Sequence, residues 1–267
     1  MSFFHLFIVA VIQGLTEFLP VSSSGHLVLV PYITGQADQG IAIDVAAHVG
    51  SLFAVVLYFW KDVRIAGAGT LRLLQGKIDT HGAFLALCLA IATVPVIVVG
   101  ALIYLAGLTE AIRSVAVIGW SMLGFGLVLY WADKTGAETR RAANWTIKDA
   151  AIMGLAQVLS LIPGTSRSGI TITAARRLGY DREGAAKLAM LMSIPTIIAS
   201  GALLSVDVIH TANWQMAREA LIATVFSFLA ALLALSLMMR LLKSISFTPY
   251  VVYRVILGVA LLIYAYS

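Results

Sequence analysis

A polar run set between apolar stretches occurs twice in this chain and constrains the fold more than any other feature. Residues 13–26 read QGLTEFLPVSSSGH, and residues 157–169 read QVLSLIPGTSRSG. In one common register the identical pairs include Gln13 with Gln157, Ser22 with Ser166, Ser24 with Ser168, Gly25 with Gly169 and Gly35 with Gly179. Ser23 of the first copy corresponds to Arg167 of the second, so a candidate nucleophile is paired with a candidate anion binder.

The composition places these runs in a membrane protein. Of 267 residues, 60% are hydrophobic and only 12% are charged, with a mean hydropathy of +0.95. A soluble domain would carry roughly twice that share of charge. The single cysteine, Cys88, lies in an apolar run, which excludes a disulfide framework and a CxxC metal site. The N-terminal residues lack the basic start and cleavage site of a removable signal peptide.

Each polar run interrupts apolar pieces that are too short to cross a bilayer. Residues 5–12 and 27–33 flank the first run, and a broken piece spans residues 150–175. A crossing helix needs about 20 residues. An irregular break is tolerated at membrane depth only where it lines a cavity or is buried in protein, so we expect two re-entrant hairpins. Full-length spans are expected at residues 42–60, 84–106, 114–132, 186–206, 219–239 and 249–266.

The predicted fold is therefore an all-α polytopic membrane protein with an inverted repeat. Each half consists of one re-entrant helix hairpin plus three transmembrane helices. The halves are residues 1–135 and 150–267, within a single integral membrane domain of residues 1–267. An odd number of crossings in each half inverts one half relative to the other. That architecture places a binding site at the midplane, between the two broken helices.

The loop charges agree with this map. Fourteen of the 18 basic residues fall on one side: Lys61, Arg64, Arg72, Lys77, Lys134, Arg140, Arg141, Lys148, Arg176, Arg177, Arg182, Lys187, Arg240 and Lys243. Arg113 and Arg218 fall on the other side, and Arg167 and Arg254 lie within membrane segments. The positive-inside rule makes the basic loops cytoplasmic and both termini external. This distribution accounts for the pI of about 9.4 without nucleic acid.

The polar residues of the first run suggest two kinds of chemistry. Gln13 and Glu17 share a helix face, as a proton acceptor or metal-ligand pair would, or as a hydrogen bond between packed helices would. A carboxylate in an apolar segment is costly and is a functional candidate by default. The hydroxyls of Ser22, Ser23 and Ser24 could cap the next helix, whose N-terminus is also a phosphate-binding site.

The second run offers the same geometry with an arginine added. The Arg167 guanidinium can bind phosphate oxygens bidentately, or the side chain can extend to the membrane interface. His26 is a candidate base, leaving-group acid or hydrogen-bond partner. Asp44, His48 and Arg254 also lie in predicted spans, where they would support the site or join helices.

Both runs resemble the signatures of a known family. The run at residues 13–26 is similar to the Glu/Gln-x-x-x-Glu motif and serine segment of the undecaprenyl-diphosphate phosphatase family, linked to bacitracin resistance. PGTSRSG, at residues 163–169, is similar to the second signature of that family. The resemblance extends to Phe59-Trp60 and to residues 245–254, so it covers nearly the whole chain.

This resemblance implies hydrolysis of undecaprenyl diphosphate to undecaprenyl phosphate and inorganic phosphate, which recycles the lipid carrier for cell-wall synthesis in the bacterial inner membrane. By resemblance the nucleophile is Ser23, the carboxylate is Glu17, the phosphate-binding arginine is Arg167, and His26 assists catalysis. The substrate-binding residues expected around them are Gln13, Ser22, Ser24, Gly25, Thr165, Ser166, Ser168 and Gly169. A divalent cation, Mg²⁺ or Ca²⁺, would bind at Glu17, although Gln13 stands where many members have Glu.

Two mechanisms and one other function class stay open at this stage. Ser23 could attack the terminal phosphorus with help from His26 or Glu17, or water could attack while Ser23 only binds. Inverted repeats with broken helices are also the plan of secondary transporters, so a transporter or flippase of a lipid phosphate or small anion is the alternative. The expected partners are a polyprenyl diphosphate lipid and membrane lipid, with a homodimer as a further candidate and no nucleic acid.

Overall fold

The computed structural model describes residues 2–35, 39–108, 114–209 and 214–267, and those residues form helices and connecting turns with no strand. The α-helices are α1 (Phe3–Phe18), α2 (Ser23–Thr34), α3 (Ile41–Tyr58), α4 (Trp60–Leu74), α5 (His81–Leu105), α6 (Val115–Thr135), α7 (Ile147–Val158), α8 (Arg167–Arg177), α9 (Arg182–Ile209), α10 (Trp214–Leu241) and α11 (Thr248–Tyr266). Two 3₁₀ turns, η1 (Ala142–Asn144) and η2 (Leu159–Leu161), flank α7.

Six of these helices are long and apolar enough to cross a membrane. They are α3, α5, α6, α9, α10 and α11, and they overlap the six spans predicted from the sequence. Many of their large apolar side chains face outward, as a lipid-facing surface requires. The prediction of an all-helical, multi-pass membrane protein is confirmed.

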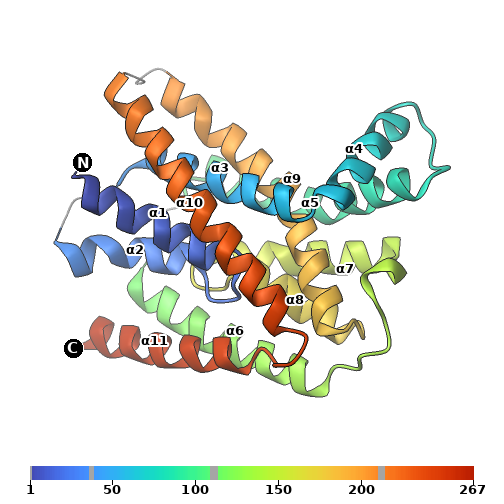
Figure 1. The fold of residues 1–267 in the computed structure, drawn as a ribbon. Coiled ribbons are helices and arrows are strands. Elements are labelled where there is room, and N and C mark those ends of the chain that lie inside the picture. Colours follow the sequence, from blue (N-terminus) through green and yellow to red (C-terminus); the bar gives the residue numbers. More distant parts are fainter. Residues whose placement is uncertain (1, 36–38, 109–113, 210–213) are drawn as a thin grey trace.

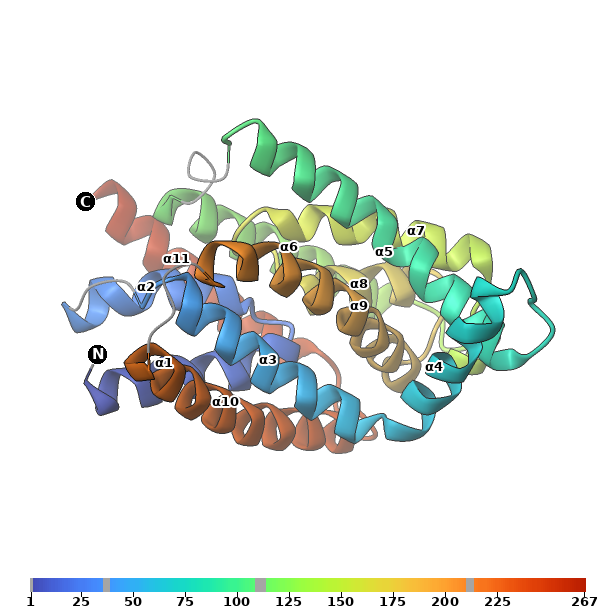
Figure 2. The same cartoon turned by 90° about the horizontal axis from the view of Figure 1, so that it is seen from above.

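Four shorter helices form two broken pairs. Helices α1 and α2 have 16 and 12 residues, and α7 and α8 have 12 and 11 residues. In Figures 1 and 2 the α1–α2 pair lies toward the end of the molecule that carries both chain termini, whereas α7 lies toward the opposite end. The two helices of each pair pack against each other, and the two breaks lie together in the middle of the bundle.

Small residues allow the long helices to approach closely. A Cβ atom on Gly50 of α3 would collide with the carbonyl oxygen of Thr224 in α10 and would lie 2.9 Å from the backbone nitrogen of Phe228. Across this interface the Ser227 hydroxyl donates to the Ala47 carbonyl at 2.6 Å. Because lipid offers no hydrophobic drive for helix association, such close packing and interhelical hydrogen bonds stabilise the pair.

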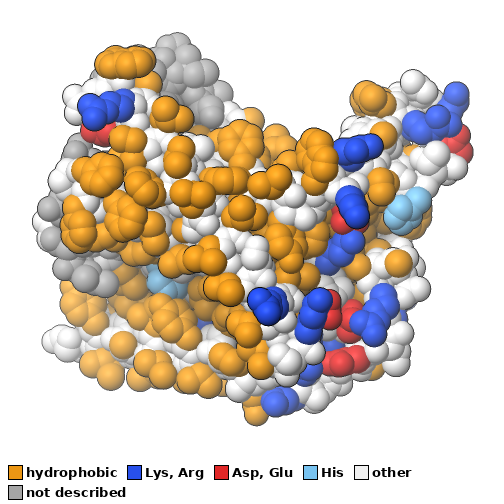
Figure 3. Space-filling model, viewed as in Figure 1, with side chains coloured by type: hydrophobic (Ala, Val, Ile, Leu, Met, Phe, Trp, Pro, Cys, Tyr) orange, Lys and Arg blue, Asp and Glu red, His pale blue; other side chains and the backbone are white. Residues whose placement is uncertain are grey.

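The first basic loop contains a helix that the sequence map did not predict. α4 begins directly after α3 and carries exposed Ile65, Leu71 and Leu74 among its basic residues. No continuous apolar stretch in the sequence therefore identifies this helix. Figure 3 shows Lys and Arg side chains gathered at the end of the molecule away from the termini. Arg218 lies in α10 near the other end, and Arg113 falls outside the described residues.

We expect Gly50→Leu to lower the melting temperature of the detergent-purified protein. Overpacking of a tight contact costs about 1–3 kcal/mol, and here backbone atoms of α10 would have to move. Gly124→Leu in α6 is the matched control, since an added Cβ there meets nothing within 4 Å. Equal melting curves for the two variants would contradict the close α3–α10 contact.

Candidate active site

Glu17 connects the polar groups of the two halves. It lies in the last turn of α1 and is only 7% exposed. Its Oε2 accepts hydrogen bonds from Gln13 Nε2 at 2.8 Å and from Ser23 Oγ at 2.8 Å. Its Oε1 accepts from Arg167 Nη2 at 3.0 Å. One carboxylate therefore orients a hydroxyl of the first break and a guanidinium of the second.

The two breaks have the same backbone geometry. Ser22 and Ser166 have φ values of 74° and 71°, and they are the only described non-glycine residues with positive φ. Each serine caps the following helix, with its Oγ accepting from Gly25 N at 3.3 Å or from Gly169 N at 3.1 Å. Such conformations cost about 1–3 kcal/mol each and persist only where the surroundings hold them. Two residues that align in the sequence, Ser22 and Ser166, thus also share a backbone conformation.

A cavity of about 150 Å³ lies over these groups. Its lining residues are Glu17, Ser22, Ser23, Ser24, His48, Ser160, Ser166, Arg167, Thr196, Ile197 and Ser200. The N-termini of α2 and α8 both begin at this cavity, because Ser22 and Ser166 are the caps of those helices. Helix N-termini carry partial positive charge and favour anions. The cavity therefore combines hydroxyls, two helix ends and a guanidinium.

Arg254 of α11 lies beneath the two breaks and is fully buried. Its guanidinium donates to the carbonyls of Pro20 in the first break, at 3.2 Å, and of Gly164 and Thr165 in the second, at 3.0 and 2.9 Å. It also donates to carbonyls of α6. The sequence indicated only a supporting role for Arg254. Its partners are backbone carbonyls rather than groups of the cavity lining, so it holds the breaks in position.

His26 is turned away from the candidate nucleophile. Its Nδ1 is 2.6 Å from the Ser22 carbonyl, and its Nε2 is 2.5 Å from the hydroxyl of Tyr253. The two rings are stacked with centroids 5.6 Å apart. Both ring nitrogens are therefore engaged, and His26 is not among the residues that line the cavity. The geometry favours a hydrogen-bond partner over a base for Ser23.

His48, rather than His26, is the histidine that approaches Glu17. Its Nε2 lies 3.7 Å from Glu17 Oε2, while its Nδ1 is 2.7 Å from the Asp44 carbonyl. The carbonyl can only accept, so Nδ1 carries a proton. Sequence analysis placed His48 in a span but could not predict its approach to Glu17, which depends on how α3 packs.

The other predicted residues are close to the breaks but differ in exposure to the cavity. The Ser24 and Ser168 hydroxyls pair with those of Ser22 and Ser166 at 3.3 and 3.1 Å. Thr165 is fully buried. Sequence analysis missed Ser160, which lies inside the second polar run but was not singled out there. It also missed Thr196, Ile197 and Ser200, because nothing in their local pattern distinguishes them from ordinary helix residues.

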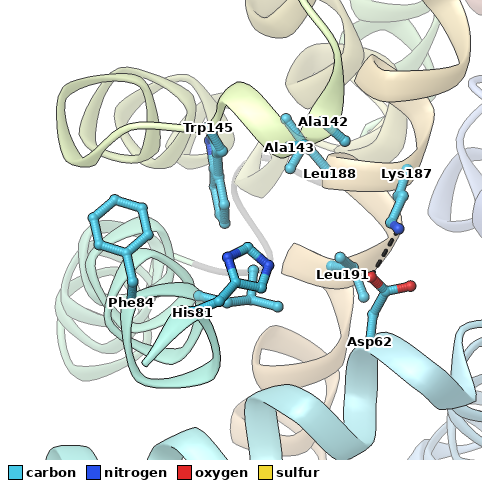
Figure 4. Close-up of a pocket in the computed structure, with 10 residues that line it drawn as sticks. Asp62, His81, Phe84, Ala142, Ala143, Trp145, Lys187, Leu188 and Leu191 are labelled. Atoms are coloured by element: carbon cyan, nitrogen blue, oxygen red, sulfur yellow. Dashed lines mark ion pairs between the residues drawn. The ribbon is translucent and has the colours of Figure 1, made fainter. Parts of the chain in front are cut away.

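A separate pocket of about 300 Å³ lies between α4, α5, η1 and α9. Figure 4 shows His81 and Phe84 of α5 near Trp145, with an ion pair between Asp62 and Lys187 at its edge. That ion pair has a length of 2.7 Å and ties α4 to α9. None of the sequence-predicted site residues lines this pocket, so it is not part of the candidate site.

The described residues offer limited ligands for a divalent cation. They contain no group of three or more His, Cys, Asp or Glu side chains suited to a metal ion. Glu17 is the single carboxylate of the cavity, although the Oε1 atom of the neighbouring Gln13 is buried and has no partner among these residues. Mg²⁺ commonly binds through one or two carboxylates plus substrate phosphates. This donor set fits a cation that substrate oxygens largely coordinate, rather than a cage made by protein.

Comparisons with known proteins identify the family. A family model described as Bacitracin resistance protein BacA matches residues 6–260. An undecaprenyl-diphosphatase of Roseobacter denitrificans is 76% identical over 267 residues, covering 100% of both chains. The undecaprenyl-diphosphatase of Dinoroseobacter shibae is 68% identical with the same coverage, and that of Maricaulis maris is 44% identical over 99% of each chain. The resemblance predicted from the two motifs is confirmed, and the chain belongs to the bacitracin resistance protein BacA family.

Proposed function

We propose that this protein hydrolyses undecaprenyl diphosphate to undecaprenyl phosphate and inorganic phosphate. Relatives named undecaprenyl-diphosphatase match its whole length, one of them at 76% identity. The observation that carries the proposal in this chain is the Ser23–Glu17–Arg167 contact, in which one carboxylate meets a hydroxyl and a guanidinium. A transporter needs an anion site but has no use for a serine hydroxyl directed at a carboxylate.

In the proposed reaction Ser23 Oγ attacks the terminal phosphorus while its proton passes to Glu17 Oε2, 2.8 Å away. The bond between that phosphorus and the bridging oxygen breaks, and undecaprenyl phosphate leaves. Water then attacks the phosphoserine, releasing inorganic phosphate and restoring the hydroxyl. Glu17 is favoured over His26 as the proton acceptor because both nitrogens of His26 already have partners. A serine hydroxyl is a weak nucleophile without such a base.

Arg167 and the two helix ends would stabilise the charge of the transferred group. Phosphoryl transfer depends mainly on positioning and on charge neutralisation. Arg167 uses one N–H on Glu17 and one on the Ala189 carbonyl, which leaves further N–H groups of its planar fork for phosphate oxygens. Its side chain is 12% exposed and lines the cavity.

We expect Ser23→Ala to reduce phosphate release from undecaprenyl diphosphate by at least about a thousand-fold, because the nucleophile is lost. Arg167→Ala should cost about a hundred- to a thousand-fold, the usual effect of deleting one charge-stabilising donor. Phosphate release by purified protein in detergent measures both. Ser236→Ala in α10, where the hydroxyl only bonds the Leu232 carbonyl, is the control and should match wild type.

The outcomes separate the two mechanisms. If Ser23→Ala stays active while Arg167→Ala does not, the phosphatase stands and direct attack by water replaces the covalent step. If wild-type protein binds the lipid and releases no phosphate, the transporter alternative is favoured.

We also propose that Glu17, together with oxygens of the diphosphate, would hold Mg²⁺ or Ca²⁺. Bound there, the cation would neutralise charge on the diphosphate. Gln13 lies beside Glu17 and lacks the charge of a second carboxylate, so the protein contributes weakly to cation binding.

We expect EDTA to abolish phosphate release and added Mg²⁺ or Ca²⁺ to restore it. Gln13→Glu adds a second carboxylate next to Glu17 and should lower the cation concentration that gives half-maximal activity, because ligand charge sets the affinity for hard cations. A titration of activity against cation concentration tests this. An unchanged midpoint in Gln13→Glu would remove residue 13 from the cation site.

For the architecture, we propose that residues 1–135 and 150–267 are inverted repeats, each a re-entrant hairpin plus three spans. The shared backbone conformation of Ser22 and Ser166 supports this, as do the broken pairs that approach from opposite ends in Figure 1. The helix pairs are also repeated: α1 packs on α10 as α7 packs on α5. The basic end would face the cytoplasm of a bacterial inner membrane, with both termini outside. A homodimer stays a prediction.

Cysteine labelling tests this topology. In a Cys88→Ala background, Ser2→Cys and Ser267→Cys should react in intact cells with a membrane-impermeant maleimide. Gln75→Cys after α4 and Ala137→Cys after α6 should react only after permeabilisation. Residues 2 and 75 are separated by the first broken pair and one span, so labelling of both from outside would mean that the pair crosses the membrane.

A further inference from the structure

An apolar groove of about 530 Å³ adjoins the candidate site. Its walls are the second half of α5, including Ile97 and Gly100, and the middle of α9, including Leu203, with Leu161 of η2 between them. Ile97 and Leu203 are 44% and 47% exposed, so the groove is open along its length rather than filled. Nothing in the proposed phosphoryl transfer uses these side chains.

The groove and the polar cavity share two residues, Thr196 and Ser200. Their hydroxyls are turned back to their own helix, with Thr196 Oγ1 donating to the Met192 carbonyl at 3.0 Å and Ser200 Oγ donating to the Ile197 carbonyl at 3.2 Å. Since these hydroxyls are satisfied, the boundary between cavity and groove can face hydrocarbon. A molecule with an anionic head and an apolar tail could therefore occupy both spaces at once.

The groove leads toward one side of the membrane. Along α5 it continues to Tyr104, one residue before the helix ends, and that side chain is 48% exposed. Exposed tyrosines are typical of the membrane–water interface. The C-terminal ends of α5 and α9 lie toward the part of the molecule that carries the chain termini in Figure 2. The pocket in Figure 4 is lined from α4 and the start of α5, which lie away from the termini in Figure 2. It includes the charged pair Asp62–Lys187, which does not suit an isoprenoid chain.

We propose that the groove between α5 and α9 binds the head-proximal isoprenoid units of the substrate, which enters sideways from the leaflet on the side of the termini. This inference rests on the proposed function for the identity of the lipid. The tail leaves one hydrocarbon environment for another, so hydrophobic transfer contributes little and close van der Waals contact must supply the fit. The groove therefore acts by aligning the diphosphate with Ser23 and Arg167 more than by adding affinity.

A single-cysteine experiment tests occupancy without turnover. Cys88 is the only cysteine and is buried, so Cys88→Ala with Gly100→Cys leaves one thiol in the groove. The change is mild because a Cβ on Gly100 would lie 3.5 Å from the nearest Leu161 atom. Adding Ser23→Ala prevents hydrolysis. Undecaprenyl diphosphate at about ten times its Kd should slow maleimide labelling of this thiol about ten-fold, whereas inorganic diphosphate should not.

Gly124→Cys in α6 is the matched control, since it lies exposed on a membrane helix and an added Cβ contacts nothing. Its labelling should be unaffected by either ligand. In the active background Gly100→Leu should lower kcat/KM for undecaprenyl diphosphate about ten-fold, because it fills the groove. Gly124→Leu should leave kcat/KM unchanged.

The outcomes keep this inference separate from the proposed function. If wild type hydrolyses the lipid but the Gly100→Cys thiol is labelled equally fast with and without it, the groove assignment is wrong and the phosphatase stands. If the lipid protects the thiol and wild type releases no phosphate, the groove is a tail site and the proposed function is wrong. Protection by inorganic diphosphate alone would also overturn the assignment, since no tail is then needed.

Discussion

The buried guanidinium of Arg254 ties together two breaks that are about 140 residues apart in sequence. It donates to the carbonyl of Pro20 in the first break and to those of Gly164 and Thr165 in the second. Unpaired carbonyls at membrane depth would cost several kcal/mol each, so irregular backbone there needs such a donor. The arginine also explains why residue 169 is glycine, since a Cβ there would lie 2.9 Å from Arg254 Nη1. The strained caps Ser22 and Ser166 depend on this support.

This arrangement fixes the charge of the site. The described partners of Arg254 are neutral carbonyls, so its positive charge remains beneath the cavity without a carboxylate. Arg167 is paired with Glu17, and that pair is neutral overall. The N-termini of α2 and α8 add partial positive charge from both halves. The balance favours a strongly anionic ligand, which fits a diphosphate better than a neutral or cationic solute.

Much of this site could be predicted from sequence because its signals are local. Glu17 follows Gln13 by one helical turn, and the two are in contact as expected; the serine caps follow from the repeated motif. The prediction was weaker where long-range packing decides. His26 follows Ser23 closely in sequence, yet helical geometry turns its ring toward Tyr253 of α11. His48 reaches Glu17 only because α3 packs against α1, and α4 was missed because its apolar residues are interspersed with charges.

The site joins two requirements that a lipid diphosphate imposes together. Its head needs positive charge and hydrogen-bond donors, which in a bilayer can exist only inside protein. Its tail needs an open apolar path from that interior to the lipid. The two broken helix pairs satisfy the first, because each brings a helix N-terminus, that of α2 or α8, to the middle of the bundle. The proposed groove between α5 and α9 would satisfy the second, because its wall residues Ile97 and Leu203 are exposed. Thr196 and Ser200 lie at the boundary between the polar cavity and the apolar groove. Because each hydroxyl donates to a carbonyl of its own helix, this boundary can contact both the head and the tail.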